Sequence, residues 1–173
     1  PIFDLPRVPF HDAGLRAHRV PVKGGAGGQF VDLWPLSIKG RVVEVAVLSM
    51  GNPHAVQLVD DVDTADVEQI GPLVSKHARF PRGVNAGFMQ ILNRGQVKLR
   101  VYERGAGETL ACGTGVSASA LITAQVHGFS SPVRVRVEGG DQLQVSFQQE
   151  GAGFSDVRLT GPADFVFHGQ VSV

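Results

Sequence analysis

The sequence predicts an α+β fold in which a mixed, mostly antiparallel sheet wraps around one central helix. Short apolar runs recur along the chain and are separated by Gly, Pro or Asp, which is typical of strands joined by turns. The segment 116–126 is rich in Ala and carries no charge, so we expect a buried helix there. The runs show no regular alternation of strand and helix, which argues against a Rossmann fold.

The individual elements follow from local periodicity. A second, solvent-facing helix is expected over 65–77, capped by Asp63 or Thr64, with Val67, Ile70, Val74 and Leu73 on its buried side. Gln96–Glu103 should form a hairpin with the run before it, because Asn93-Arg94-Gly95 is a typical turn. The expected strands cover residues 17–22, 29–38, 41–48, 55–59, 84–92, 96–103, 133–138, 143–147, 154–159 and 164–167.

The composition excludes several classes of function. Lys and Arg number 16 and Asp and Glu number 16, so the chain has no charge excess for binding nucleic acid or an anionic membrane. The single Cys allows neither an internal disulfide nor a Cys-rich zinc cluster, and the scattered His residues predict no metal site. No apolar run approaches the roughly 18 residues of a membrane span, and the start of the chain does not have the pattern of a signal peptide.

Cys112 is the first candidate for chemistry, because it directly precedes the expected buried helix. Free amides and the helix dipole at such a position are expected to lower the pKa of the thiol. The amides of Gly113 and Thr114 can also bind a carboxylate. A thiolate beside a carboxylate site suits removal of a proton from Cα of an amino acid. The alternative is an ordinary buried cysteine.

Two further clusters are candidates. His54, in the turn Asn52-Pro53-His54, can pair with a thiolate, or it can be a simple turn residue. Glu103 and Arg104 can bind a zwitterionic head group through an ammonium and a carboxylate, or they can form a surface ion pair. No Lys lies in a recognisable setting for a pyridoxal Schiff base.

Three blocks of the chain closely resemble the signature of the diaminopimelate epimerase family. They are RVYERGAGETLACGTG at 100–115, SMGNPHAV at 49–56 and RFPRGVNAGF at 79–88, and they occur in the family's order and spacing. The resemblance extends over essentially the whole chain. Proline racemases share a C-G-T-G element but not the approach to it or G-N-P-H.

The resemblance implies a cofactor-independent and metal-free isomerase that interconverts LL- and meso-diaminopimelate in lysine and peptidoglycan precursor synthesis. It also implies a cytoplasmic homodimer. Cys112 would be one of two catalytic cysteines, tuned by His54 and Glu103, and Gly113 and Thr114 would hold the reacting carboxylate. The distal end of the substrate would be bound by Asn52, Asn85, Glu103 and Arg104.

The chain departs from the family in one large respect. Inversion by two bases needs a second Cys, which the family carries in an E-C-G-N-G type motif on its first lobe, and this sequence has no second Cys. We therefore expect residues 1–13 to connect from a missing first lobe, 14–157 to form the second lobe, and 158–173 to hold a final strand returning toward the first lobe. We expect the polypeptide alone not to epimerise.

Two other functions fit the same residues. Cys112 and His54 could be the nucleophile and base of a Cys–His hydrolase. Alternatively, the chain could be a non-catalytic half-domain that binds a zwitterionic ligand or a partner lobe.

Overall fold

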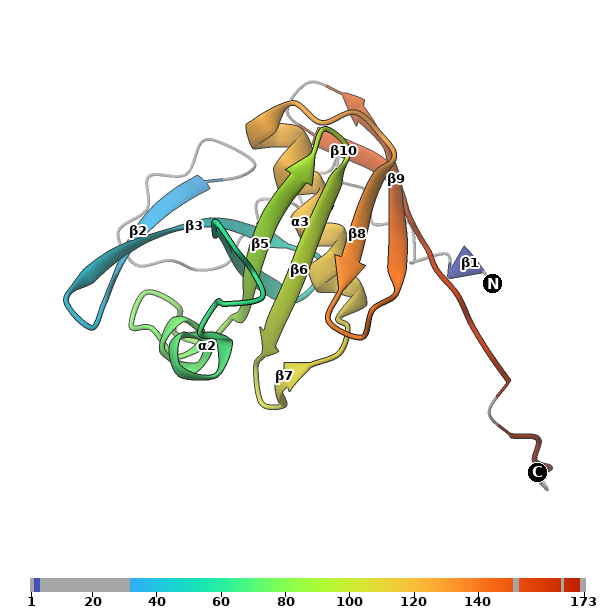
Figure 1. Cartoon of the computed structure of the whole chain (residues 1–173), viewed down its shortest axis with the longest axis horizontal. Helices are drawn as coiled ribbons and strands as arrows, with labels where there is room; N and C mark the ends of the chain where they lie inside the picture. The colour runs from blue at the N-terminus through green and yellow to red at the C-terminus, as the bar shows by residue number, and fades with distance from the viewer. Residues whose placement is uncertain (1, 4–31, 151–152, 166, 172–173) are drawn as a thin grey trace.

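The structure is a computed structural model that describes residues 2–3, 32–150, 153–165 and 167–171. Over these residues, ten strands pair into one sheet and two helices pack on it (Figure 1). The predicted α+β fold, with a mixed and mostly antiparallel sheet around a central helix, is confirmed. The expected strand over 17–22 and the start of the one over 29–38 lie outside the described residues.

The helices are α2 (Val67–Ser75) and α3 (Gly113–His127). The strands are β1 (Ile2–Phe3), β2 (Asp32–Ile38), β3 (Arg41–Ser49), β4 (Pro53–Leu58), β5 (Asn85–Asn93), β6 (Gln96–Glu103), β7 (Gly107–Thr109), β8 (Val133–Val137), β9 (Gln142–Glu150) and β10 (Gly153–Thr160).

The sheet is mixed because both helices serve as crossovers. Its order is β1-β10-β9-β8-β6-β5-β4-β3-β2, with β7 paired to β6 beside this path. The pairs β4–β5 and β6–β8 are parallel, and the other pairs are antiparallel. Parallel neighbours need a long connection, and here α2 lies between β4 and β5 while α3 lies between β6 and β8. The sequence pattern predicted the four strands of these two pairs but not their parallel pairing.

The two faces of the sheet carry separate apolar cores. On β3, Ala46 and Leu48 belong to the core around α3, whereas Val45 and Val47 belong to the core on the α2 side. This division follows from the alternation of side chains along a strand. Figure 1 shows α3 running along the strands and α2 near one end of β5 and β6.

Helix α3 is buried along most of its length, as predicted from its lack of charge. All ten residues from Gly115 to Ala124 are buried. The helix contacts β3, β4, β5, β6, β8, β9 and β10. It ends at Gly128, whose φ of 68° is the left-handed conformation that glycine tolerates at a helix C-cap. At its other end the N-cap is Cys112, so the wrapped sheet fixes the position of this thiol.

Helix α2 is shorter than the expected 65–77. Its N-cap is Asp66 rather than Asp63 or Thr64, and the cap makes no side-chain hydrogen bond. Val67 and Val74 are buried as predicted, whereas Ile70 is half-buried and Leu73 is exposed. The Asp63 carboxylate instead pairs with Lys98 on β6. Neither described helix has the length and apolar character that crossing a membrane requires.

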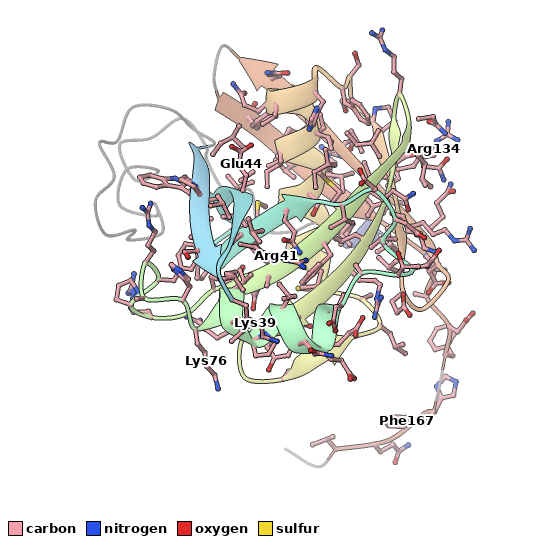
Figure 2. All side chains as sticks on the ribbon, turned by 60° about the vertical axis from the view of Figure 1, so that its left-hand side comes forward. Lys39, Arg41, Glu44, Lys76, Arg134 and Phe167 are labelled. Atoms are coloured by element: carbon pink, nitrogen blue, oxygen red, sulfur yellow. The ribbon has the colours of Figure 1, made fainter. Side chains whose placement is uncertain are left out.

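The expected strand over 164–167 is wrong for the residues described there, none of which is in a strand. Gly161 and Pro162 follow the end of β10, and proline has no N–H to donate to a sheet. Figure 2 shows Phe167 on a tail that leads away from the sheet. The predicted boundary between 157 and 158 falls inside β10, and the division into lobes stays a prediction.

Gly71 allows α2 to lie against β6, and this contact is testable. A Cβ at position 71 would lie 2.5 Å from Cβ of Tyr102, closer than packed atoms allow. Gly71→Ala should therefore lower the free energy of unfolding by about 1–3 kcal/mol through overpacking, although alanine alone favours a helix. Urea denaturation measures the effect.

Gln69→Ala is the matched control, because Gln69 is an exposed residue of the same helix. It should change the free energy of unfolding by less than about 0.5 kcal/mol. A Gly71→Ala variant as stable as the parent chain would contradict the close contact.

Candidate active site

The N-terminus of α3 and the start of β4 bring four of the predicted site residues together. Thr114 is the centre of the cluster. Its Oγ1 lies 3.6 Å from Sγ of Cys112, 3.1 Å from Nδ2 of Asn52 and 3.1 Å from Nε2 of His54. The His54 Nε2 also lies 3.1 Å from Oδ1 of Asn52. Cys112 and His54 are both buried.

The hydrogen-bond directions of this cluster follow from the donors that each side chain has. The Asn52 amide nitrogen can only donate, so the Thr114 oxygen accepts from it. The Asn52 carbonyl oxygen accepts from His54, which requires the proton on Nε2. With that tautomer, His54 cannot accept from Thr114, and the Thr114 hydroxyl is left to donate to the sulfur of Cys112. The arrangement thus stabilises a thiolate.

Burial dominates the titration of both ionisable groups in the cluster. It lowers the pKa of His54 to about 4, so the imidazole is neutral at pH 7. Burial also raises the pKa of the Cys112 thiol, although hydrogen bonds from Thr114 and from the Gly115 amide favour the thiolate. The negative charge of Glu103 raises the pKa of the thiol further. The predicted lowering of the Cys112 pKa is therefore wrong, because loss of water outweighs the local donors.

Small residues let the thiol lie against the first turn of α3. A Cβ at Gly115 would lie 3.3 Å from Sγ of Cys112, and a Cβ at Gly113 would lie 3.2 Å from the Leu159 side chain. The first intrahelical hydrogen bond runs from the Val116 amide to the Cys112 carbonyl. The amides of Gly113 and Thr114 precede it and have no acceptor within the helix. They are free to bind an anion beside the thiol.

The other predicted residues lie along the neighbouring strands. Asn85 pairs with His54 in the parallel register of β4 and β5, and its Oδ1 accepts a 2.8 Å hydrogen bond from the Arg104 amide. Glu103 accepts a 2.7 Å hydrogen bond from the hydroxyl of Thr109. The Arg104 guanidinium does not join the Thr114 cluster. It donates to the Arg82 carbonyl at 2.6 Å.

Arg104 also lines a cavity of about 660 Å³. Lys76 and Arg82 are the other cations that line it, and no Asp or Glu is among the lining residues. Figure 2 shows Lys76 pointing outward below the sheet. The cavity is therefore suited to an anionic group.

Among the residues that the structure describes, no three His, Cys, Asp or Glu side chains gather as metal ligands would.

The sequence pattern assigned no role to Thr109, which donates a hydrogen bond to Glu103. In the sequence, the E-T pair before the C-G-T-G element is the only indication of a role for Thr109, and this pair does not identify Glu103 as the partner of Thr109.

The buried neutral His54 predicts a loss of stability in mild acid. Its pKa is 6.5 when unfolded and about 4 when folded, so the unfolded chain binds more protons between these values. The stabilisation is complete above pH 6.5 and is lost as the pH falls, by about 2 kcal/mol at pH 5. Urea denaturation at pH 7.5 and pH 5 measures this loss.

His54→Gln is the control, because glutamine can hydrogen bond but does not titrate. It should lose about 2 kcal/mol less between the two pH values than the parent chain. Equal losses in the two proteins would show that His54 does not carry this pH dependence.

The fold has counterparts among solved structures. A hydroxyproline epimerase from Agrobacterium vitis with bound trans-4-OH-L-proline superposes with a TM-score of 0.59 at 20% identity, over 76% of this chain and 46% of that one. A probable proline racemase from Agrobacterium radiobacter K84 with bound carbonate gives 0.59 at 19% identity, over 83% and 51%. At this identity the likeness shows a shared fold.

Sequence comparison goes further. The profile of the diaminopimelate epimerase family matches residues 46–166. Diaminopimelate epimerases of Acidovorax ebreus and Leptothrix cholodnii are 49% and 50% identical to this chain, over 100% of it and 57% of their own length. The chain thus spans little more than half the length of these curated relatives. The match covers the blocks that hold the Thr114 cluster, and the chain belongs to the diaminopimelate epimerase family.

Proposed function

We propose that Cys112 is one of two thiols in a cofactor-independent epimerase that interconverts LL- and meso-2,6-diaminopimelate, in the synthesis of lysine and peptidoglycan precursors. The observation that carries the proposal is the cluster around Thr114. It joins the lone thiol to Asn52 and His54 at a helix N-terminus, in a chain that belongs to the diaminopimelate epimerase family.

The reacting amino-acid end would bind at the start of α3. Its carboxylate would accept hydrogen bonds from the amides of Gly113 and Thr114, which have no acceptor within the helix. Removal of the α-proton delocalises the carbon's electron pair into that carboxylate, so the same amides stabilise the charge that develops. Cys112 directly precedes these amides in the chain, so its sulfur would lie close to Cα of the bound substrate.

With two thiols, the proton removed from Cα and the proton delivered to it are both accounted for. A thiolate takes the proton from Cα on one face, and a thiol on the opposite face delivers its own proton to the carbanion. The carbon is inverted, neither carbon nor sulfur changes oxidation state, and the two sulfurs have exchanged protonation states. Cys112 acts as the base in one direction and as the acid in the other.

The distal amino-acid end would bind beside the thiol, on Asn52, Asn85, Glu103 and Arg104. A guanidinium pairs with a carboxylate and a carboxylate accepts from an ammonium, so Arg104 and Glu103 together complement a zwitterion. Lys76, Arg82 and Arg104 line the cavity and give it the positive charge that a second carboxylate needs. Diaminopimelate has two such ends, one to react and one to be recognised.

The second thiol must come from polypeptide outside this sequence, which has one Cys. We propose that a first lobe with an E-C-G-N-G type motif supplies it, and that the family-typical homodimer and cytoplasmic location apply to the complete enzyme. The support is the 57% coverage of the relatives together with the need for two bases on opposite faces.

The alternative of a Cys–His hydrolase has less support. Such an enzyme needs an imidazole that takes the proton of the thiol. Here Nε2 of His54 hydrogen bonds to Asn52 and Thr114, and burial holds the pKa of the imidazole near 4. His54 is therefore linked to the sulfur through Thr114, and it is a poor base at pH 7.

An aziridine analogue of diaminopimelate should alkylate Cys112 at a rate that saturates as the concentration of the analogue rises, and meso-diaminopimelate should slow the reaction. Arg104→Ala should raise the half-saturating concentration about tenfold, because a charged hydrogen bond to the distal carboxylate is lost. Intact mass and peptide mapping follow the label, with Cys112→Ala as the unlabelled control. Non-saturating labelling at the rate of a simple aziridine amino acid would contradict the proposed substrate site.

The chain alone should not convert meso-diaminopimelate to the LL isomer, because one thiol can return a proton only to the face from which it came. Chiral chromatography after incubation in heavy water measures the product. Addition of a separate polypeptide that carries the E-C-G-N-G motif should restore conversion, and Cys112→Ala should abolish it. The appearance of the LL isomer with the chain alone would overturn the two-thiol assignment.

A further inference from the structure

The strand β7 is the last element before Cys112, and its two faces make different contacts. It has three residues and pairs antiparallel with β6, with Thr109 opposite Val101 and Glu108 opposite Tyr102. Opposed residues of such a pair point to the same face. Glu108 therefore shares a face with Tyr102 and Arg100, on the α2 side, whereas Thr109 shares the α3 face with Val101 and Glu103.

On the α2 side, Glu108 is held by a two-pronged ion pair. Nε and Nη2 of Arg100 donate to its two carboxylate oxygens at 2.6 and 3.0 Å. The remaining nitrogen, Nη1, donates to the carbonyl oxygens of Val62 and Ala65, each at 3.1 Å. Both charged side chains are about one-sixth exposed or less, at 15% and 16%. The guanidinium thus ties β7 to the segment before α2 and gives this short strand an anchor.

On the α3 side, the hydroxyl of Thr109 donates to Oε1 of Glu103 at 2.7 Å. Glu103 lies near enough to the Cys112 thiol for its charge to act on the sulfur. Because side chains alternate, a slip of β7 by one residue would turn Thr109 away from Glu103. A three-residue strand has few backbone hydrogen bonds to resist a slip, so the Arg100–Glu108 ion pair on the other face helps to keep β7 in register.

We propose that Thr109 is a positioning residue that holds the Glu103 carboxylate beside the Cys112 thiol, and that the Arg100–Glu108 pair keeps Thr109 in register. This inference rests on the proposed function, in which Cys112 is a reacting thiol, and it takes up the tuning role that the family resemblance implies for Glu103. It adds three residues to those that control the reactivity of Cys112, namely Thr109, Glu108 and Arg100. These three residues do not touch the reacting atoms.

The charges around the thiol make the effect of Thr109 predictable. Glu103 on β6 acts on the sulfur directly, and the neutral His54 on β4 is linked to it through Thr114. The first turn of α3 carries no acidic side chain. Without the Thr109 hydroxyl, the half-buried Glu103 carboxylate finds its best partner in water and moves away from the thiol. Its negative charge then opposes ionisation of the sulfur less.

The experiment uses the single Cys of the chain, since every alkylation by iodoacetamide then reports on Cys112. The pH midpoint of the alkylation rate is measured for the parent chain, Thr109→Val, Thr109→Ser and Glu103→Gln. Thr109→Val should move the midpoint down by about half a pH unit, which is about threefold more thiolate at a pH below the midpoint. Glu103→Gln should move it in the same direction, and Thr109→Ser should leave it in place.

The anchor is tested with Glu108→Ala against Asp63→Ala. Both remove one acidic side chain from the same face of the sheet, but Asp63 pairs with Lys98 and does not hold β7. Glu108→Ala should lower the midpoint, and Asp63→Ala should not. Circular dichroism at each pH confirms that every variant is folded.

An unchanged midpoint in folded Thr109→Val, or the same shift in Thr109→Ser, overturns the role of Thr109. An unchanged midpoint in Glu108→Ala overturns the role of the anchor. If Thr109→Val does not fold, Glu103→Gln and Thr109→Ser test the inference in its place. The inference requires the pH midpoint to move down in Glu103→Gln and to stay in place in Thr109→Ser. Alkylation needs no substrate, so these outcomes are independent of whether the chain binds diaminopimelate.

Discussion

The burial of an uncharged helix inside the curved sheet is the constraint on which the rest of the structure depends. Helix α3 has no polar face, so the strands must surround it. Two of its buried polar side chains bond within the helix, because the hydroxyls of Ser117 and Thr123 donate to the Gly113 and Ala120 carbonyls. The sheet contacts the helix on several sides and so sets the position of Cys112 relative to β4 and β6.

The same burial sets the electrostatics of the candidate site. Loss of water raises the pKa of Cys112 and lowers that of His54, so both groups are neutral at pH 7. The helix start, which favours a thiolate in an exposed setting, does not overcome this effect. Stabilisation of the thiolate therefore falls to specific donors, namely the Thr114 hydroxyl and the Gly115 amide.

The sequence predicted the parts of the molecule that local pattern decides. The uncharged run at 116–126 identified α3, and the motifs identified the residues that meet at Thr114. It did not predict β7, because Gly107–Thr109 looks like part of a glycine-rich loop until β6 pairs with it. Nor did it predict the parallel pairing of His54 with Asn85, which depends on the crossover through α2. The strand expected over 164–167 failed for a related reason, since an apolar alternation becomes a strand only where a neighbour accepts its hydrogen bonds.

A neutral cluster suits two-thiol proton transfer better than nucleophilic attack. A Cys–His nucleophile depends on an imidazolium that stabilises the thiolate, which requires the histidine to bind the proton that the sulfur releases. A histidine with a pKa near 4 does not bind it at pH 7. In two-thiol exchange, by contrast, one sulfur must hold a proton while the other lacks one. A raised pKa then serves both roles, because it keeps the acid protonated and makes the thiolate a stronger base. The feature that overturned the expected pKa of Cys112 thus supports the proposed two-thiol epimerase over a Cys–His hydrolase.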